Sequence, residues 1–326
     1  MNNTPVRQIP DSEIRDLDAR TLAERLSQVE DRRVVQMADN VDWLWQQIEA
    51  DGENAGVPLC WPEFEDSFGW RDGEVTLLAG PNNSGKSALM SQLALHYSRH
   101  KPVGLISLEE PFDKQVHRLL RQAYADRHPS KAQFVDLANL LDGQLWHYQA
   151  YGTVQTARIY GCLDAFARRG CKLAVIDNLQ KCGINDDWDQ QREFMNNLIA
   201  LAQILGLHIV LVHHTRKRGQ GISGRSSSDD VRGSSALTDL ATNLMIVNRD
   251  FDRADALQKQ LNGEFLTEAD KDLLDEGHDV DFRIQKQKFG TNWNGTIKLW
   301  TGAGLTFKTG HNSDDLKLPM SLVKTL

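Results

Sequence analysis

Short apolar runs alternate with amphipathic stretches along most of the chain after Trp70. The runs are nearly continuous and rich in Val, Ile and Leu, which is typical of strands that are buried on both faces of a parallel sheet. The stretches between them have the length and spacing of helices. The pattern therefore predicts an α/β fold with helices on both faces of the sheet. Strands are expected at EVTLLA (74–79), VGLISLE (103–109), KLAVID (172–177), HIVLVHH (208–214) and NLMIVN (243–248).

The two ends of the chain follow other patterns. Apolar residues recur at helical spacing near the start, and VDWLWQQIE (41–49) predicts a second short helix before the prolines of VPLCWP. Near the other end, FRIQKQKFG, GTIKLW and GLTFK alternate and are separated by turn residues, which predicts an antiparallel edge. We expect a helical leader (1–56), one α/β domain (57–310) and a tail (311–326). The apolar residues of the leader are Ile14, Leu17, Leu22, Leu26 and Val29.

Composition narrows the class of protein. The chain has 326 residues, no apolar run of the ~18 residues needed to span a bilayer, and no signal peptide at its start, so we expect a cytoplasmic protein without a membrane partner. Its four cysteines form no C-x-x-C pair, and we expect reduced thiols rather than zinc ligands or disulfides.

The net charge of −8 excludes a surface that is basic all over, but it allows a local basic channel for nucleic acid. Much of the acid lies in the segment 251–281. We interpret this segment first as a solvated helical insertion, and second as a docking site for another protein.

The strongest motif is G-x-x-x-x-G-K-S, between Gly80 and Ser87. It follows a predicted strand and opens a predicted helix, as a phosphate-binding loop requires. Backbone amides and the helix start would hold phosphate, Lys86 would reach the outer phosphates of ATP or another NTP, and Ser87 would bind Mg²⁺. The residues expected to bind the nucleotide in this loop are Gly80, Pro81, Asn82, Asn83, Ser84, Gly85, Lys86, Ser87 and Ala88.

Acidic residues end two other predicted strands. Asp177 follows an apolar run directly, where a P-loop protein needs an acid for its Mg²⁺ site. Glu109 and Glu110 end the strand after the P-loop helix, and either carboxylate is placed to activate a water molecule. Adjacent acids at a strand end are also common on solvated surfaces, so this second signal is weaker.

Histidine and basic residues follow the strand at 208–214. His213 and His214 point to opposite faces, so only one of them faces the ends of the strands that carry the phosphate site. A basic run and the loop GQGISGRSSS come next, and Gly233 stands at a loop-to-helix junction farther on. This arrangement suits a polyanionic ligand. The candidate DNA-binding residues are Arg216, Lys217, Arg218, Arg225, Arg232 and Gly233.

In this order the motifs resemble DnaB-like replicative helicases, and most of all the phage and mitochondrial branch with Twinkle and the phage primase-helicases. The motifs are GEVTLLAGPNNSGKSALM, GLISLEE, LAVIDNLQ, IVLVHHTRK, DVRGSSALTDLATNLMIVNRD and RIQKQKFG, and the resemblance spans roughly Trp61 to Phe307. It implies a RecA-like P-loop NTPase fold, a hexameric ring, ATP and Mg²⁺ as cofactors, single-stranded DNA as partner, and a bacterial or phage-infected cell. A primase or polymerase is a further candidate partner.

The resemblance also implies roles for single residues. Glu109 would be the catalytic base, and His214 would sense the γ-phosphate and signal to the basic loop. Arg249 would pack on the nucleotide base. Lys286 and Lys288 would enter the ATP site of a neighbouring subunit, and the leader stripe would dock on that neighbour.

One position departs from the family, which usually has arginine where Lys288 stands. Lysine keeps the charge but lacks the planar fork of arginine, so strong ATP hydrolysis is in doubt, or the role passes to Lys286. The favoured hypothesis is an ATP-dependent helicase that moves along single-stranded DNA. The alternative is a DNA-binding RecA-like ATPase that regulates or loads another factor with weak hydrolysis. A small-molecule kinase fits poorly, since no acceptor lid is recognisable.

Overall fold

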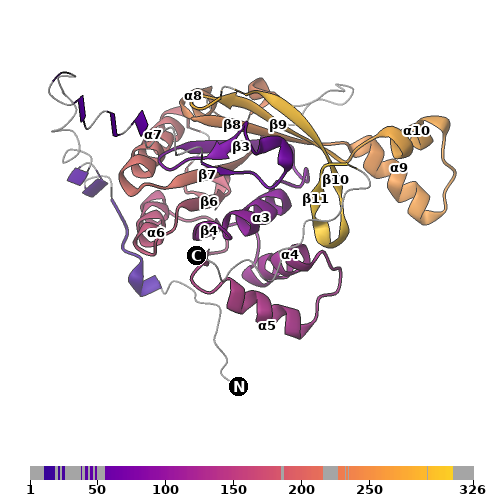
Figure 1. Cartoon of the computed structure of the whole chain (residues 1–326), viewed down its shortest axis with the longest axis horizontal. Helices are drawn as coiled ribbons and strands as arrows, with labels where there is room; N and C mark the ends of the chain where they lie inside the picture. The colour runs from indigo at the N-terminus through magenta and orange to yellow at the C-terminus, as the bar shows by residue number, and fades with distance from the viewer. Residues whose placement is uncertain are drawn as a thin grey trace.

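A nine-stranded sheet lies at the centre of the computed structural model (Figure 1). The structure describes residues 11–18, 56–184, 187–215, 227–231, 233, 235–291 and 293–310, with short pieces between 21 and 49. The strand order is β11-β10-β9-β8-β3-β7-β6-β4-β5. The strands are β3 (Val75–Gly80), β4 (Val103–Ser107), β5 (Leu145–Gln149), β6 (Leu173–Asp177), β7 (His208–His214), β8 (Asn243–Arg249), β9 (Val280–Gln287), β10 (Gly295–Thr301) and β11 (Phe307–Lys308).

The strands from β8 to β5 in this order run parallel, whereas β9, β10 and β11 pair antiparallel at the other edge. Helices cover both faces because neighbouring strand residues point to opposite sides. Leu77 of β3 packs in one apolar core with α6 and α7, and Leu78 packs in the other with α3 and α4. The helices are α3 (Lys86–Tyr97), α4 (Phe112–Tyr124), α5 (Lys131–Leu140), α6 (Thr156–Arg168), α7 (Trp188–Leu205), α8 (Ser235–Leu240), α9 (Phe251–Asn262) and α10 (Glu268–Glu276).

The predicted fold class is confirmed, and each predicted strand exists within a few residues of its expected bounds. The sequence did not predict β5, whose segment LWHYQ mixes apolar and polar residues because it lies at an edge of the sheet. It also did not predict the small sheet of β1 (Val57–Pro58) and β2 (Gly69–Trp70).

Part of the leader stripe packs on the same chain. Ile14, Leu17 and Leu22 are buried in the core that contains α6. Leu17 N donates to Ala157 O at 3.1 Å, and Arg158 Nη1 donates to Ile14 O at 2.6 Å. Leu26, Val29 and much of 41–49 lie outside the described residues. Docking on a neighbouring subunit stays a prediction for the assembled ring.

Two expectations from composition are met in the described part of the chain. None of its helices is long and apolar enough to cross a membrane. All four cysteines are free thiols; Cys162, Cys171 and Cys182 are buried and Cys60 is half-buried. The acidic segment 251–281 contains α9 and α10, which form a hairpin of helices between β8 and β9.

Candidate functional site

The glycine-rich loop joins β3 to α3 and lines a cleft of about 1130 Å³ at the carboxyl ends of the parallel strands. Gly80 ends β3, where a Cβ would collide with Val247 O, and Gly85 has a φ of 90° at the helix N-cap, so both positions favour glycine. The residues lining the cleft are Asn82, Asn83, Ser84, Gly85, Lys86, Ser87, Ala88, Glu109, Asp177, Gln180, His214, Thr215 and Arg249.

Lys86 bends back over its own loop. Its Nζ donates to Gly80 O at 3.0 Å and to Pro81 O at 2.6 Å, and the residue is 5% exposed. Burial lowers the pKa of Lys86 to about 8, while the negative charges of Asp177 and Glu109 act in the opposite direction. The ammonium group is therefore held ready beside the cleft by weak carbonyl partners that a phosphate oxygen can replace.

Strand register brings the other predicted residues to the same place. Ser107 of β4 lies opposite Asp177 of β6, and Leu108 N donates to Asp177 O at 2.7 Å, so that Glu109 follows directly beside Asp177. His214 of β7 lies opposite Gly80. Because parallel strands end at one edge of the sheet, residues more than 100 positions apart in sequence meet there.

Asp177 and Ser87 form the pair that suits Mg²⁺. Burial raises the pKa of Asp177, and a hydrogen bond from Ser87 acts against that rise. Among the described residues, Asp177 Oδ1 and the buried Ser84 Oγ have no hydrogen-bond partner. Hard oxygen ligands facing a phosphate-binding loop fit an Mg²⁺ ion that is shared with a nucleotide.

Glu109 and Glu110 have different surroundings. Glu109 lines the cleft, whereas Glu110 Oε2 forms an ion pair with Arg118 Nη1 of α4 at 2.5 Å. Arg118 Nε also donates to Ser91 Oγ of α3 at 2.9 Å. Glu110 therefore ties α4 to α3, and the carboxylate available to the cleft is Glu109.

His214 connects the candidate base to the loop that follows β7. Its Nε2 lies 3.6 Å from Glu109 Oε1, which is longer than a hydrogen bond, and 2.8 Å from Asn178 Nδ2. The adjacent His214 holds the pKa of Glu109 below its ordinary value, against the effect of burial. Glu109 is thus ionised at neutral pH, as a base must be. His213 is 2% exposed and does not line the cleft.

Arg249 closes another side of the cleft from the end of β8. Its Nη1 donates to Asn83 O at 3.4 Å, and its guanidinium lies 5.9 Å from the ring centroid of Phe251. This position beside the P-loop is compatible with the packing on a base that the family resemblance implies.

Lys286 and Lys288 lie at the other end of the sheet. Gln287, between them, is opposite Asn243, which is opposite Thr76 near the start of β3. Thr76 is four residues from Gly80, or about 13 Å along the strand. Lys286 Nζ donates to Thr238 O at 3.0 Å and Asp239 O at 2.7 Å, so it caps α8. Lys288 is exposed, with Nζ 5.5 Å from the Phe289 ring centroid. Within one chain, neither lysine reaches the cleft.

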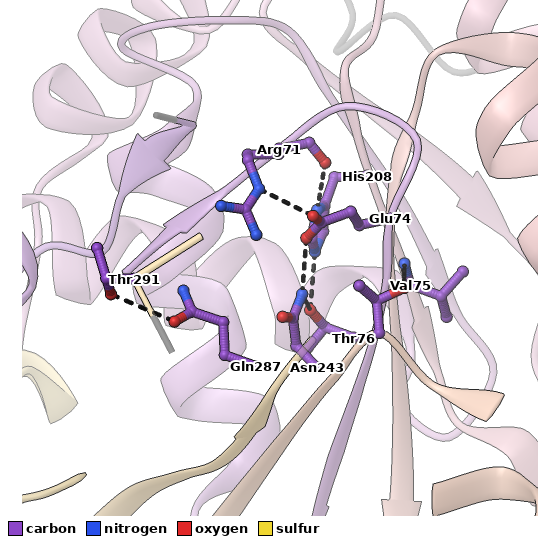
Figure 2. A network of polar contacts seen from close by, with 9 residues as sticks. Arg71, Glu74, Val75, Thr76, His208, Asn243, Gln287 and Thr291 are labelled. Carbon is purple, nitrogen blue, oxygen red and sulfur yellow. Dashed lines mark hydrogen bonds and ion pairs between the residues drawn. The ribbon is translucent and has the colours of Figure 1, made fainter. Parts of the chain in front are cut away.

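A buried polar network fixes that end of the sheet (Figure 2). Asn243 Nδ2 donates to Glu74 Oε2 at 2.9 Å and to Thr76 Oγ1 at 3.2 Å, and Thr76 Oγ1 is 2.8 Å from His208 Nε2. Arg71 Nε donates to Glu74 Oε1 at 2.8 Å. The network joins the first residues of β3, β7 and β8. It therefore supports the strand β9 that carries the two lysines.

Most of the predicted DNA-binding residues lie outside the described residues: Arg216, Lys217, Arg218, Arg225 and Arg232. The segment that contains them begins after Thr215, which forms a bridge with Val231. Gly233 is described, with a φ of 94° and with Gln191 Oε1 in the place that a Cβ would need. Glycine is therefore required there by packing alone, and its role toward DNA stays a prediction.

The sequence analysis did not single out three residues at the site. Gln180 and Thr215 line the cleft, and Asn178 contacts His214. Each follows a predicted strand-end residue by one to three positions, and that adjacency was the available signal.

Residues 67–220 match the protein family described as "AAA domain". No functionally curated protein matches the chain in sequence. The fold is similar to the solved ATPase domain of a helicase, with a TM-score of 0.64, 18% identity, and coverage of 85% of this chain and 100% of that one. It is also similar to a DnaB-like replicative helicase whose structure is described with its interactions with primase, with a TM-score of 0.60, 18% identity, and coverage of 89% and 71%. The chain is therefore a P-loop NTPase whose domain has the RecA-like fold of DnaB-like replicative helicases.

Proposed function

We propose that this protein is an ATP-dependent DNA helicase that moves along single-stranded DNA as a ring of identical subunits, six in the family it resembles. One observation carries the proposal. Lys86, Asp177 and Glu109 share a cleft with His214, and the basic segment begins two residues after that histidine. A nucleotide site that adjoins a cationic segment in this way can couple nucleotide state to the grip on a polyanion.

The residues of the cleft divide the chemistry among them. Lys86 holds the outer phosphates, and Ser87 and Asp177 would hold Mg²⁺, which supplies charge neutralisation on the phosphate oxygens when bound. Glu109, ionised at neutral pH, accepts a proton from the attacking water. His214 contacts Glu109 and is joined to the basic segment through the backbone, so a shift of either is transmitted to the other.

The neighbouring subunit supplies the missing cations in this proposal. Lys286 and Lys288 lie about 13 Å along the sheet from their own P-loop, so they can reach an ATP site only in another copy. Lys288 is the more available of the two, because Lys286 already caps α8. DNA binding rests on Arg216, Lys217, Arg218, Arg225 and Arg232 and is expected to depend on salt more than on sequence. A primase or polymerase is a candidate partner of the ring, by analogy with the helicase described with primase.

Strand displacement on a forked duplex tests the motor. We expect Lys86→Ala to abolish NTP hydrolysis and displacement, while the exposed Lys131→Ala on α5 leaves both unchanged. Displacement that persists in Lys86→Ala without ATP would refute the motor mechanism. ATP-dependent DNA binding without displacement by the unaltered protein would favour the regulator or loader instead. Particle mass with an ATP analogue and single-stranded DNA tests the ring.

A further inference from the structure

The helical hairpin of α9 and α10 projects from the end of the sheet, away from the covered faces (Figure 1). Arg253, which is 6% exposed, fixes its base: Nε donates to Asp279 Oδ1 at 3.0 Å and Nη1 donates to Leu274 O at 2.8 Å. Lys259 Nζ joins the two helices through Asp270 Oδ1 at 2.9 Å. The projection is therefore held in one shape before any partner arrives, which reduces the entropy lost on binding.

Large apolar side chains are exposed toward the tip of this hairpin. Leu257 is 40% exposed, Leu261 is 74% exposed, and Phe265 in the connection is 87% exposed. Leu257 and Leu261 are four residues apart and so share one face of α9. We call these three residues the apolar tip. A hairpin that served only as a solvated insertion would carry polar residues there, so the tip departs from the interpretation favoured by composition.

Charge selects the kind of partner. Between residues 251 and 276 the chain has eight Asp or Glu and three Lys or Arg, so this hairpin carries −5 of the net charge of −8. The three basic side chains bind within the hairpin or at its base: Arg253 to Asp279, Lys259 to Asp270 and Lys271 to Glu268. The surface around the apolar tip is left strongly acidic.

Other occupants fit this surface poorly. Nucleic acid and anionic lipid are repelled by an acidic surface. A second copy of this chain is acidic as well, and like charges across an interface oppose association. A positively charged protein segment with apolar side chains satisfies both the charge and the exposed hydrophobic area.

We propose that the apolar tip docks a basic amphipathic helix of another protein. The interaction is helix against helix: apolar side chains of the partner pack on Leu257, Leu261 and Phe265, and its Lys or Arg side chains face Asp255 and Glu264 at the rim. This inference does not rest on the helicase proposal, because the hairpin contributes no residue that carries out the proposed hydrolysis.

A defined peptide serves as the probe, with the full chain as receptor. A labelled peptide of about 18 residues, with Leu and Lys at helical spacing, is titrated with the protein and followed by fluorescence anisotropy. A Lys/Ser peptide of equal charge and a Leu/Glu peptide of equal hydrophobicity are the controls. The tip variant is Leu261→Ser with Phe265→Ser, and the matched variant is Val135→Ser with Tyr151→Ser, two exposed apolar residues elsewhere.

We expect the Leu/Lys peptide to bind the unaltered and matched proteins equally, and the tip variant about tenfold or more weakly. Asp255→Asn with Glu264→Gln is also expected to weaken binding. Equal affinity of the tip variant, or equal binding of the Lys/Ser peptide, overturns the proposal. It is also overturned if the tip variant loses self-association instead, since the occupant is then a second copy. If the double variant does not fold, Phe265→Ser alone decides. NTP hydrolysis reports separately on the proposed function.

Discussion

His208, at the start of β7, gives a prediction for stability against pH. Its Nδ1 lies 2.7 Å from Arg71 O and its Nε2 lies 2.8 Å from Thr76 Oγ1 (Figure 2). A carbonyl only accepts, so Nδ1 donates to it, and Nε2 of the neutral ring accepts from the Thr76 hydroxyl. A second proton on Nε2 would break this bond in a fully buried place. The folded protein therefore resists protonation of His208.

The magnitude follows from the pKa. Burial lowers the pKa of His208 from 6.5 to about 4. The unfolded chain binds the proton more readily, so the contribution of His208 to stability is complete above about pH 6.5 and is lost as pH falls toward 4. Between pH 7 and pH 5 the loss is about 2 kcal/mol for a shift of this size.

Urea unfolding followed by tryptophan fluorescence at pH 7 and pH 5 measures this loss, with His208→Asn as the comparison. Asparagine retains a donor for Arg71 O but does not titrate. We expect the variant to be less stable at pH 7, and its further loss at pH 5 to be smaller than that of the unaltered protein by about 2 kcal/mol. Burial also lowers the pKa of His96 and His147 to about 4, but both histidines are present in the two proteins and cancel. An identical pH dependence in the two proteins would refute the reasoning.

Further predictions concern the cleft and the two lysines. Glu109→Gln is expected to lower the NTP hydrolysis rate by about 100-fold or more with nucleotide binding retained, whereas Glu110→Gln loses only the ion pair of α4; similar rates for the two in steady-state assays would contradict this. Nucleotide affinity, measured with a fluorescent ATP analogue, is expected to fall as pH rises through about 8, because Lys86 then loses its charge; a flat profile would count against it. Lys288→Arg is expected to raise the hydrolysis rate of the ring, and no increase would argue against a finger role. Lys286→Ala is expected to reduce the free energy of unfolding by about 1–2 kcal/mol by uncapping α8, which thermal unfolding checks.

Patterns with a local cause were visible in the sequence. The strand before the P-loop and the helix from Lys86 were predicted because apolar runs, glycines and the helix start are set by neighbouring residues. The edge strand β5 escaped, because one exposed edge weakens the apolar run. The distinction between Glu109 and Glu110 also needed the structure, since only the contact with Arg118 of α4 separates two adjacent acids.

Residue type and spacing were enough to predict the class of fold, the phosphate-binding loop and the set of residues that adjoin it, because each of these depends on one strand or turn at a time. Which of those residues meet depends on how the strands pair. The parallel register places Asp177, Glu109 and His214 beside Lys86, and the reversal of direction at β9 carries Lys286 and Lys288 to the opposite end of the sheet. The exposure of Leu261 and Phe265 was equally hidden, because an apolar residue on an amphipathic helix is buried or exposed according to what the rest of the chain packs against it.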